Sequence, residues 1–176
     1  MSQIVHPATV RRNAALPYDP IARAAELWEE RIGPSETMAV ATAVMRVQQI
    51  IQTSVDAALR PYGLTFARYE ALVLLAFSRR TCLPMGLMGQ RLQVHPTSVT
   101  NIVDRLERDR MVARVPHPTD RRTTLVQLTN YGRQRQQEAT ASVVAVNFGL
   151  AEMGDSQWAQ LWKLLAEIRR AAGDFV

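Results

Sequence analysis

The bulk composition of the sequence is that of one ordinary folded domain with short extensions. It holds 176 residues, 47% hydrophobic and 21% charged, which excludes a disordered or fibrous chain. Its 21 basic and 16 acidic residues give a net charge of +5, which favours an anionic partner such as nucleic acid. Because no segment has the roughly 18 apolar residues of a membrane span or the core of a signal peptide, we expect a cytoplasmic protein without membrane contact.

The N-terminal region predicts a loose arm and then a short helix. Residues 1–18 mix prolines, arginines and small residues without periodicity, as is typical of a disordered or loosely attached arm. A helix is expected next, because Asp19 can cap it and Pro20 suits its first position. Gly33 and Pro34 mark its end.

A long helix is predicted over residues 35–62, where apolar residues recur at three- and four-residue steps. Arg46 and Asp56 are the only charged residues between positions 36 and 60. A helix with so little charge around its circumference is central to a fold or to a subunit interface. The N-terminal helices of residues 19–62 are therefore expected to lie at one of these two places.

The middle of the chain has the pattern of a helix-turn-helix followed by a hairpin. Thr65 can cap an apolar helix, "FARYEALVLLAFS", and the "RRTCLP" segment is expected to be a loop. A short helix, "MGLMGQRL", a tight turn, "QVH", and a longer helix, "PTSVTNIVDRLERDRM", follow, with Pro96 at the favoured first helical position. "VARV" and "TTLVQL" predict two strands joined by a charged tip over residues 116–122. Residues 63–128 are thus expected to form a winged helix-turn-helix domain.

Two further helices are expected in residues 129–176. Thr129 can cap one that runs to about Leu150, and Asp155 or Ser156 can start the last. The predicted fold class is therefore mainly α with a small β-hairpin wing: a winged helix-turn-helix domain with further helices on either side.

The helix after the turn has the polar face that DNA recognition requires. Its apolar residues Val99, Ile102, Val103 and Leu106 share one side, which leaves the other side free. Short polar side chains at a helix start suit close approach to base edges and phosphates, and an arginine on a wing can enter a narrow minor groove. Asp120 is interpreted as orienting a neighbouring arginine rather than touching DNA. The DNA-binding candidates are Thr97, Ser98, Thr100, Asn101, Arg105, Asp120, Arg121 and Arg122.

Three motifs occur in the order and spacing of one protein family. They are "VTNIVDRLERDRMVAR", "DRR" at 120–122 and "LTNYG" at 128–132. From about Leu64 to Gly132 the chain resembles the MarR family of bacterial winged-helix transcription regulators. The resemblance implies a homodimer, interlocked through its terminal helices, that binds a pseudo-palindromic DNA operator and usually represses. It implies that residues 19–62 are the N-terminal helices of a dimerisation and ligand-binding region and that residues 129–176 are C-terminal dimerisation helices, so that the fold is a winged helix-turn-helix domain plus a helical dimerisation region. It also implies that a small, often aromatic or phenolic, effector weakens that binding.

The chain departs from the family pattern at a few positions. Arg110 stands where the family commonly has glycine, and a left-handed backbone there would cost an arginine about 1 kcal/mol. The added N-terminal helix with Trp28 resembles the urate-responsive branch of the family. That branch has arginine where this chain has Ile102 and aspartate where it has Glu70, which argues against urate as the ligand.

The resemblance implies a ligand site between the long helix, the helix after Thr65 and the DNA-binding lobe. Arg46 is its most informative candidate, because a cation in a charge-poor helix needs a partner, which an anionic effector or Glu70 could provide. A structural salt bridge at the dimer interface is the alternative for Arg46, and a plain core role is the alternative for the aromatic residues. The ligand-binding candidates are Trp28, Met45, Arg46, Phe66, Tyr69 and Glu70.

Catalysis is not expected. His6, His95 and His117 lie far apart in sequence, and no metal-ligand spacing, nucleophile elbow or phosphate loop occurs. We accordingly expect no cofactor and no metal, and interpret His95, beside Pro96, as a turn or cap residue or a phosphate contact. Two alternative functions stay open: an oxidant-sensing regulator that uses the single cysteine, Cys82, and a winged-helix module that contacts proteins.

Overall fold

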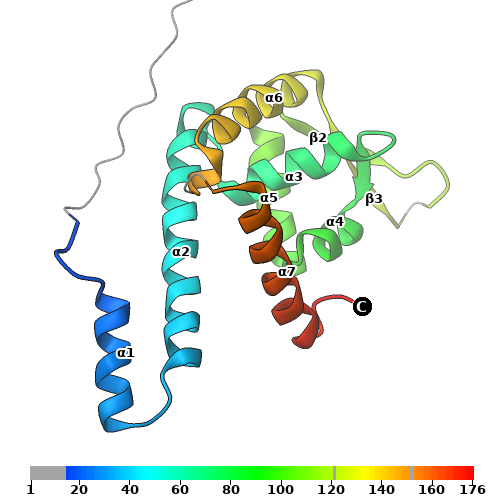
Figure 1. Ribbon diagram of the computed structural model, residues 1–176. Helices are drawn as coiled ribbons and strands as arrows, with labels where there is room; N and C mark the ends of the chain where they lie inside the picture. The colour runs from blue at the N-terminus through cyan, green and yellow to red at the C-terminus, as the bar shows by residue number, and fades with distance from the viewer. Residues whose placement is uncertain (1–14, 121, 151–152) are drawn as a thin grey trace, which may run out of the picture.

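The computed structural model describes residues 15–120, 122–150 and 153–176, and it is mainly helical with one small antiparallel sheet (Figure 1). None of the helices in these residues is both long and apolar enough to cross a membrane. The elements in chain order are α1 (Pro20–Arg31), α2 (Glu36–Leu59), the 3-10 turn η1 (Arg60–Tyr62), α3 (Phe66–Phe77), β1 (Cys82–Pro84), α4 (Met85–Leu92), α5 (Pro96–Arg108), β2 (Val112–Pro116), β3 (Thr124–Leu128), α6 (Asn130–Ala145), the 3-10 turn η2 (Asn147–Gly149) and α7 (Asp155–Ala171).

The first two helices form an antiparallel pair in which α1 lies beside the N-terminal half of α2 (Figure 1). α1 starts as predicted: the Asp19 carboxylate accepts the N–H of Ile21 at 2.9 Å, and Pro20 needs no such partner because it has no N–H. The expected arm over residues 1–18 falls mostly on residues 1–14, which lie outside the described residues.

The long helix ends where its proline and glycine predict. α2 passes into η1, and Gly63 then adopts φ +66°, a left-handed conformation that reverses the chain into α3. Thr65 precedes α3 as expected, but the predicted cap is wrong, because its side chain accepts no backbone N–H of the helix. Its hydroxyl instead accepts the Arg68 Nε–H at 3.4 Å.

The sheet contains a strand that the sequence did not indicate. β2 and β3 form the predicted hairpin, with Val112 opposite Leu128. The segment expected to be a loop supplies β1, which pairs antiparallel with β3 so that the strand order is β1-β3-β2. Three residues are too few to show a strand periodicity. The wing is therefore held on both edges of β3.

The core lies inside the lobe formed by α3 to α6 and the end of α2. Fully buried side chains come from all of these elements and interlock in one cluster. The largest of them are Leu59, Leu72, Leu75, Met88, Leu106, Val55, Val99, Val103, Val126 and Val143. This single cluster positions the helix-turn-helix and the wing relative to each other.

The helix after the wing is shorter than predicted. α6 ends at Ala145 rather than near Leu150, because Asn147 and Phe148 adopt φ +48° and +52°. Gly149 follows with φ +77° and packs tightly on α2, since a Cβ there would lie only 2.5 Å from the Cβ of Ser54. Packing on α2 thus ends α6, and α7 follows as the last helix.

Candidate nucleic-acid interface

The second helix of the helix-turn-helix, α5, exposes the polar face that its sequence predicts. Val99, Val103 and Leu106 are buried in the core. The candidate contacts on the opposite face are all exposed to solvent; they are Thr97, Ser98, Thr100, Asn101 and Arg105. Leaving this face uncovered keeps its hydroxyl, amide and guanidinium groups available to a partner.

The start of α5 is capped by a histidine. His95 has an extended backbone, with φ −60° and ψ 145°, as the residue before a proline prefers. Its Nδ1 accepts the backbone N–H of Thr97 at 3.3 Å and lies 3.1 Å from the Thr97 hydroxyl. The structure thus supports the cap interpretation of His95.

The wing tip is a closed turn built around Asp120. Its carboxylate accepts the Thr123 hydroxyl at 2.6 Å and the backbone N–H of Arg122 at 2.9 Å. These two hydrogen bonds lower the pKa of Asp120, the first contributing most. Asp120 therefore holds the main chain of Arg122, whereas its predicted pairing with an arginine side chain stays a prediction. Arg122 is exposed, and the candidate Arg121 lies outside the described residues.

An arginine of the wing is bound to α5 by two carboxylates, an arrangement the sequence analysis missed. The Arg114 guanidinium contacts Asp104 at 2.5 Å and also pairs with Glu107, and its backbone N–H donates to Glu107 at 2.9 Å. That backbone bond is the main reason that the pKa of Glu107 is lowered. The i, i+3 spacing of the two acids was the available signal. The pairing fixes the wing strand β2 against α5.

The structure brings together two of the predicted ligand-binding residues. Phe66 and Tyr69 lie on α3 with ring centroids 6.4 Å apart. Tyr69 is only 5% exposed, and its hydroxyl lies 3.1 Å from that of Thr140 on α6. Glu70 follows on the same helix, where partial burial raises its pKa.

The other ligand-binding candidates lie on the first two helices. Trp28 is on α1, and Met45 is 69% exposed on α2. The Arg46 guanidinium donates to Gln49 at 3.1 Å; within the described ranges it forms no ion pair with Glu70. A surface hollow at the start of α1 contains none of the candidates; it is lined by Tyr18, Asp19, Ala22, Arg23 and Glu26.

A helix-turn-helix with an exposed second helix, followed by a hairpin tied to that helix, defines a winged helix-turn-helix protein. Residues 62–123 match the sequence model of the MarR family. Sco5413, a MarR family transcriptional regulator from Streptomyces coelicolor, has a crystal structure that superposes on this one with a TM-score of 0.72. Its sequence is 49% identical to this chain, and the match covers 80% of this chain and 97% of the Sco5413 chain. The chain therefore belongs to the MarR family of transcriptional regulators, which are not enzymes, and the predicted fold class is confirmed.

Two further relatives extend the comparison. The transcriptional regulator PapX of Escherichia coli is 33% identical to this chain over 88 residues. These residues make up 50% of this chain and 54% of PapX, so the chain spans about half the length of that relative. CouR from Rhodococcus jostii RHA1 has a structure bound to p-coumaroyl-CoA. Its sequence is 27% identical to this chain, the match covers 73% of this chain and 90% of CouR, and the TM-score is 0.65.

Proposed function

We propose that this regulator is a homodimeric repressor that binds a pseudo-palindromic DNA operator through α5 and the wing, and that a small aromatic or anionic ligand releases it. Such a protein acts on the chromosome, in the cytoplasm. The observation that carries the proposal is the exposed polar face of α5 beside a wing tied to it by Arg114. Side chains such as Asn101 can read base edges, while Arg122 can contact the backbone or minor groove.

Exposed apolar side chains support the homodimer. α2 exposes Val40, Val44 and Ile50, and α7 exposes Trp162 and Leu164. Clusters of large exposed apolar residues on a folded protein indicate an interaction surface. A two-fold dimer also matches the symmetry of a palindromic operator. We accordingly assign residues 19–62 and 129–176 to dimerisation and residues 63–128 to DNA binding.

The ligand part of the proposal is supported by one relative and by one cation. CouR binds an aromatic acyl thioester of coenzyme A, which is anionic. Arg46 has only the neutral Gln49 as a hydrogen-bond partner in the described chain, so its charge is available to an anion. We keep Trp28, Met45, Arg46, Phe66, Tyr69 and Glu70 as the candidate ligand residues.

The test is a fluorescence-anisotropy titration of the protein with its own upstream intergenic DNA and with a scrambled duplex, at low and near-physiological salt. A specific regulator should bind the upstream DNA about a thousandfold more tightly than the scrambled duplex. Equal binding to both, erased by salt, would contradict the proposal. Adding p-coumaroyl-CoA and related aromatic carboxylates to the complex then tests release.

Single substitutions separate the two kinds of DNA contact. Arg122→Ala should weaken binding to every sequence and reduce the salt slope by about 0.9, the contribution of one phosphate contact. Asn101→Ala should instead relax base preference by about 1–3 kcal/mol and leave the salt slope unchanged.

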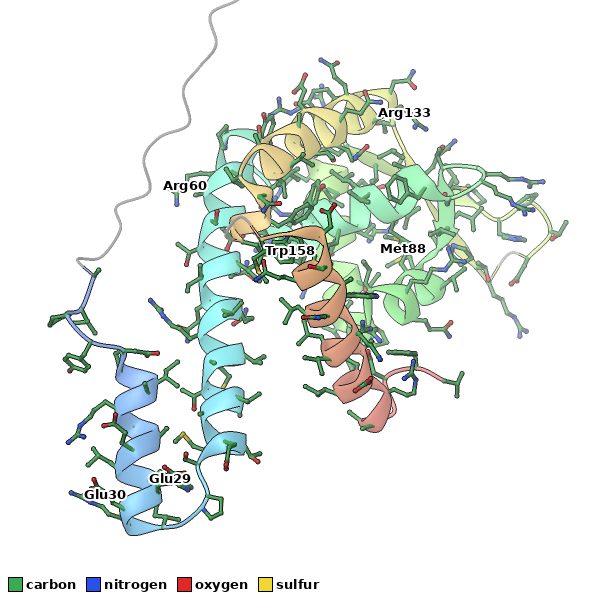
Figure 2. All side chains as sticks on the ribbon, in the orientation of Figure 1. Glu29, Glu30, Arg60, Met88, Arg133 and Trp158 are labelled. Atoms are coloured by element: carbon green, nitrogen blue, oxygen red, sulfur yellow. The ribbon has the colours of Figure 1, made fainter. Side chains whose placement is uncertain are left out.

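A matched control is Arg60→Ala, which removes the same charge in η1, just after α2 and across the molecule from the wing (Figure 2). Its salt slope should equal that of the wild type. If Arg60→Ala and Arg122→Ala change the slope equally, the effect is one of net charge and the wing assignment is wrong.

A further inference from the structure

The C-terminal tail that follows α7 contacts the turn of the helix-turn-helix. The Gln93 amide Nε2–H donates to the Asp174 carboxylate at 2.5 Å, between residues 81 positions apart in sequence. Gln93 is the residue that ends α4 and begins the turn into α5. Figure 1 shows the C-terminus beside the end of α7 and below α4. Among the described residues, no other hydrogen bond joins residues 153–176 to the rest of the chain.

The end of α7 is built so that Asp174 points away from its own helix axis. The N–H groups of Gly173 and Asp174 donate to the carbonyls of Arg170 and Arg169 at 2.9 and 3.0 Å, and Gly173 has φ +75°. These two bonds with a left-handed residue form a Schellman motif, which ends a helix by turning the chain sharply. The Asp174 Oδ2 then accepts the Arg169 Nε–H at 2.6 Å, so that Oδ1 is the oxygen that faces Gln93.

Both partners of the contact are held on their own side. The Phe175 ring lies 5.2 Å from the guanidinium carbons of both Arg169 and Arg170, an attractive cation–π arrangement that fixes the tail against α7. Gln93 has a left-handed backbone with φ +53°, and its N–H donates to the Gln90 carbonyl at 3.4 Å. The hydrogen bond between the two side chains therefore joins two segments that are each ordered by their own helix.

This contact links a helix assigned to dimerisation with the helix assigned to reading DNA. The separation of half-sites that a dimeric helix-turn-helix protein accepts is set by the distance between its two recognition helices. We propose that Gln93 and Asp174 are positioning residues that fix α5 relative to α7, and thereby set the half-site spacing that the homodimer accepts. The inference rests on the proposed function, because it concerns the dimer and the operator assigned there.

The size of the effect follows from the exposure of the contact. The hydrogen bond is exposed to solvent, where a polar pair of this kind changes an equilibrium constant by about two- to threefold. A two-fold dimer has two copies of it. Loss of both copies should therefore lower the preference for the correct half-site spacing by about fivefold.

The experiment compares two DNA duplexes with the full-length protein. One is the operator segment that footprinting locates in its upstream intergenic DNA, and the other is the same duplex with one base pair inserted at its centre. The spacing ratio is the affinity for the first divided by the affinity for the second. Gln93→Glu sets a second carboxylate against that of Asp174 and should lower the spacing ratio by about fivefold.

An exchange of the two side-chain groups tests the contact itself. Gln93→Glu with Asp174→Asn places the carboxylate on α4 and the amide on the tail, so that the amide of residue 174 donates to residue 93 while its oxygen still accepts from Arg169. Size and net charge stay those of the wild type. The double exchange should restore the wild-type spacing ratio.

The matched control is Gln90→Glu, which adds the same charge at an exposed position of α4, three residues before Gln93. It should weaken binding to both duplexes alike, because it repels phosphates of any sequence, and leave the spacing ratio unchanged. An unchanged ratio in Gln93→Glu, an equal fall in Gln90→Glu, or a fall that the double exchange does not reverse would overturn the inference while leaving operator binding intact. A wild-type spacing ratio of one would overturn the proposed binding as a homodimer, and the inference with it.

Discussion

The winged lobe and the terminal helices differ in where their apolar side chains lie. Leu72 and Val103 are fully buried in the lobe. Neither α1 nor α7, both described in full, buries a residue, and Trp162 on α7 is 66% exposed. The lobe is thus stabilised by contacts within one chain, whereas the terminal helices leave apolar area exposed, which the proposed homodimer would bury. The two regions should respond differently to substitution and to protein concentration.

The largest effect is expected from a substitution that destabilises the core of the lobe. Leu72→Ala should lower the free energy of unfolding by about 2–5 kcal/mol, because it leaves a cavity in a core that cannot fully collapse. Urea denaturation followed by circular dichroism measures the change, which should be nearly the same at every protein concentration.

The matched variant on a terminal helix is Leu164→Ala, at a side chain that is 58% exposed in the single chain. It should be nearly silent in dilute protein and become destabilising as the concentration rises, because in the proposed homodimer its partner is another subunit. A large effect of Leu164→Ala that does not depend on concentration would break the comparison between the two regions.

A smaller effect on stability is expected inside the lobe, at the turn that follows α5. Arg110 is exposed and has φ +60°, a left-handed backbone that favours glycine. Arg110→Gly should raise the free energy of unfolding by about 1 kcal/mol. Arg108→Gly, two residues earlier at the last residue of α5, should instead lower it, by less than about 1 kcal/mol. If both variants lower the Tm, the turn after α5 is not strained.

The smallest effect concerns Glu107. Its pKa is lowered in the folded protein, so its charge stabilises the fold above the ordinary carboxylate pKa and this contribution is lost as the pH falls through the lowered value. Glu107→Gln should therefore cost up to about 1 kcal/mol at neutral pH, discounted for its partial exposure, and nothing once the pH has fallen below its lowered pKa.

Glu26→Gln on α1 is the matched control for Glu107→Gln, since it removes an exposed i, i+3 pair with Arg23. It should change nothing measurable at any pH. A difference between wild type and Glu107→Gln that persists in acid would show that the contact with Arg114 acts through shape and not through charge.

The elements with clear start or stop residues could be predicted from the sequence. Pro20 and Pro96 start their helices as expected, and α4 has the predicted residues. The faces of α5 also follow from its periodicity alone. β1 could not be predicted, because a three-residue strand exists only by pairing with β3, more than 40 positions later.

The sequence predicts which helix faces of the site are exposed, but not which side chains contact one another. Exposure of Asn101 and Arg105 follows from helical spacing, whereas the attachment of Arg114 to Asp104 depends on how β2 crosses α5. Likewise Phe66 and Tyr69 share a helix and so lie close together, while the separation of Arg46 and Glu70 is set by packing between helices. Distances between elements are not encoded in any local pattern.

The joint between the wing and α6 limits which changes of chain length the protein can accept. Only Thr129 separates β3 from α6, and its side chain accepts the N–H of Gly132 while it donates to the carbonyls of Arg110 and Met111. A Cβ at Gly132 would overlap the Met111 carbonyl, 1.9 Å away. Insertions and deletions should therefore accumulate at the wing tip and be absent from this joint, so relatives can vary the reach of the wing without altering its angle to α6.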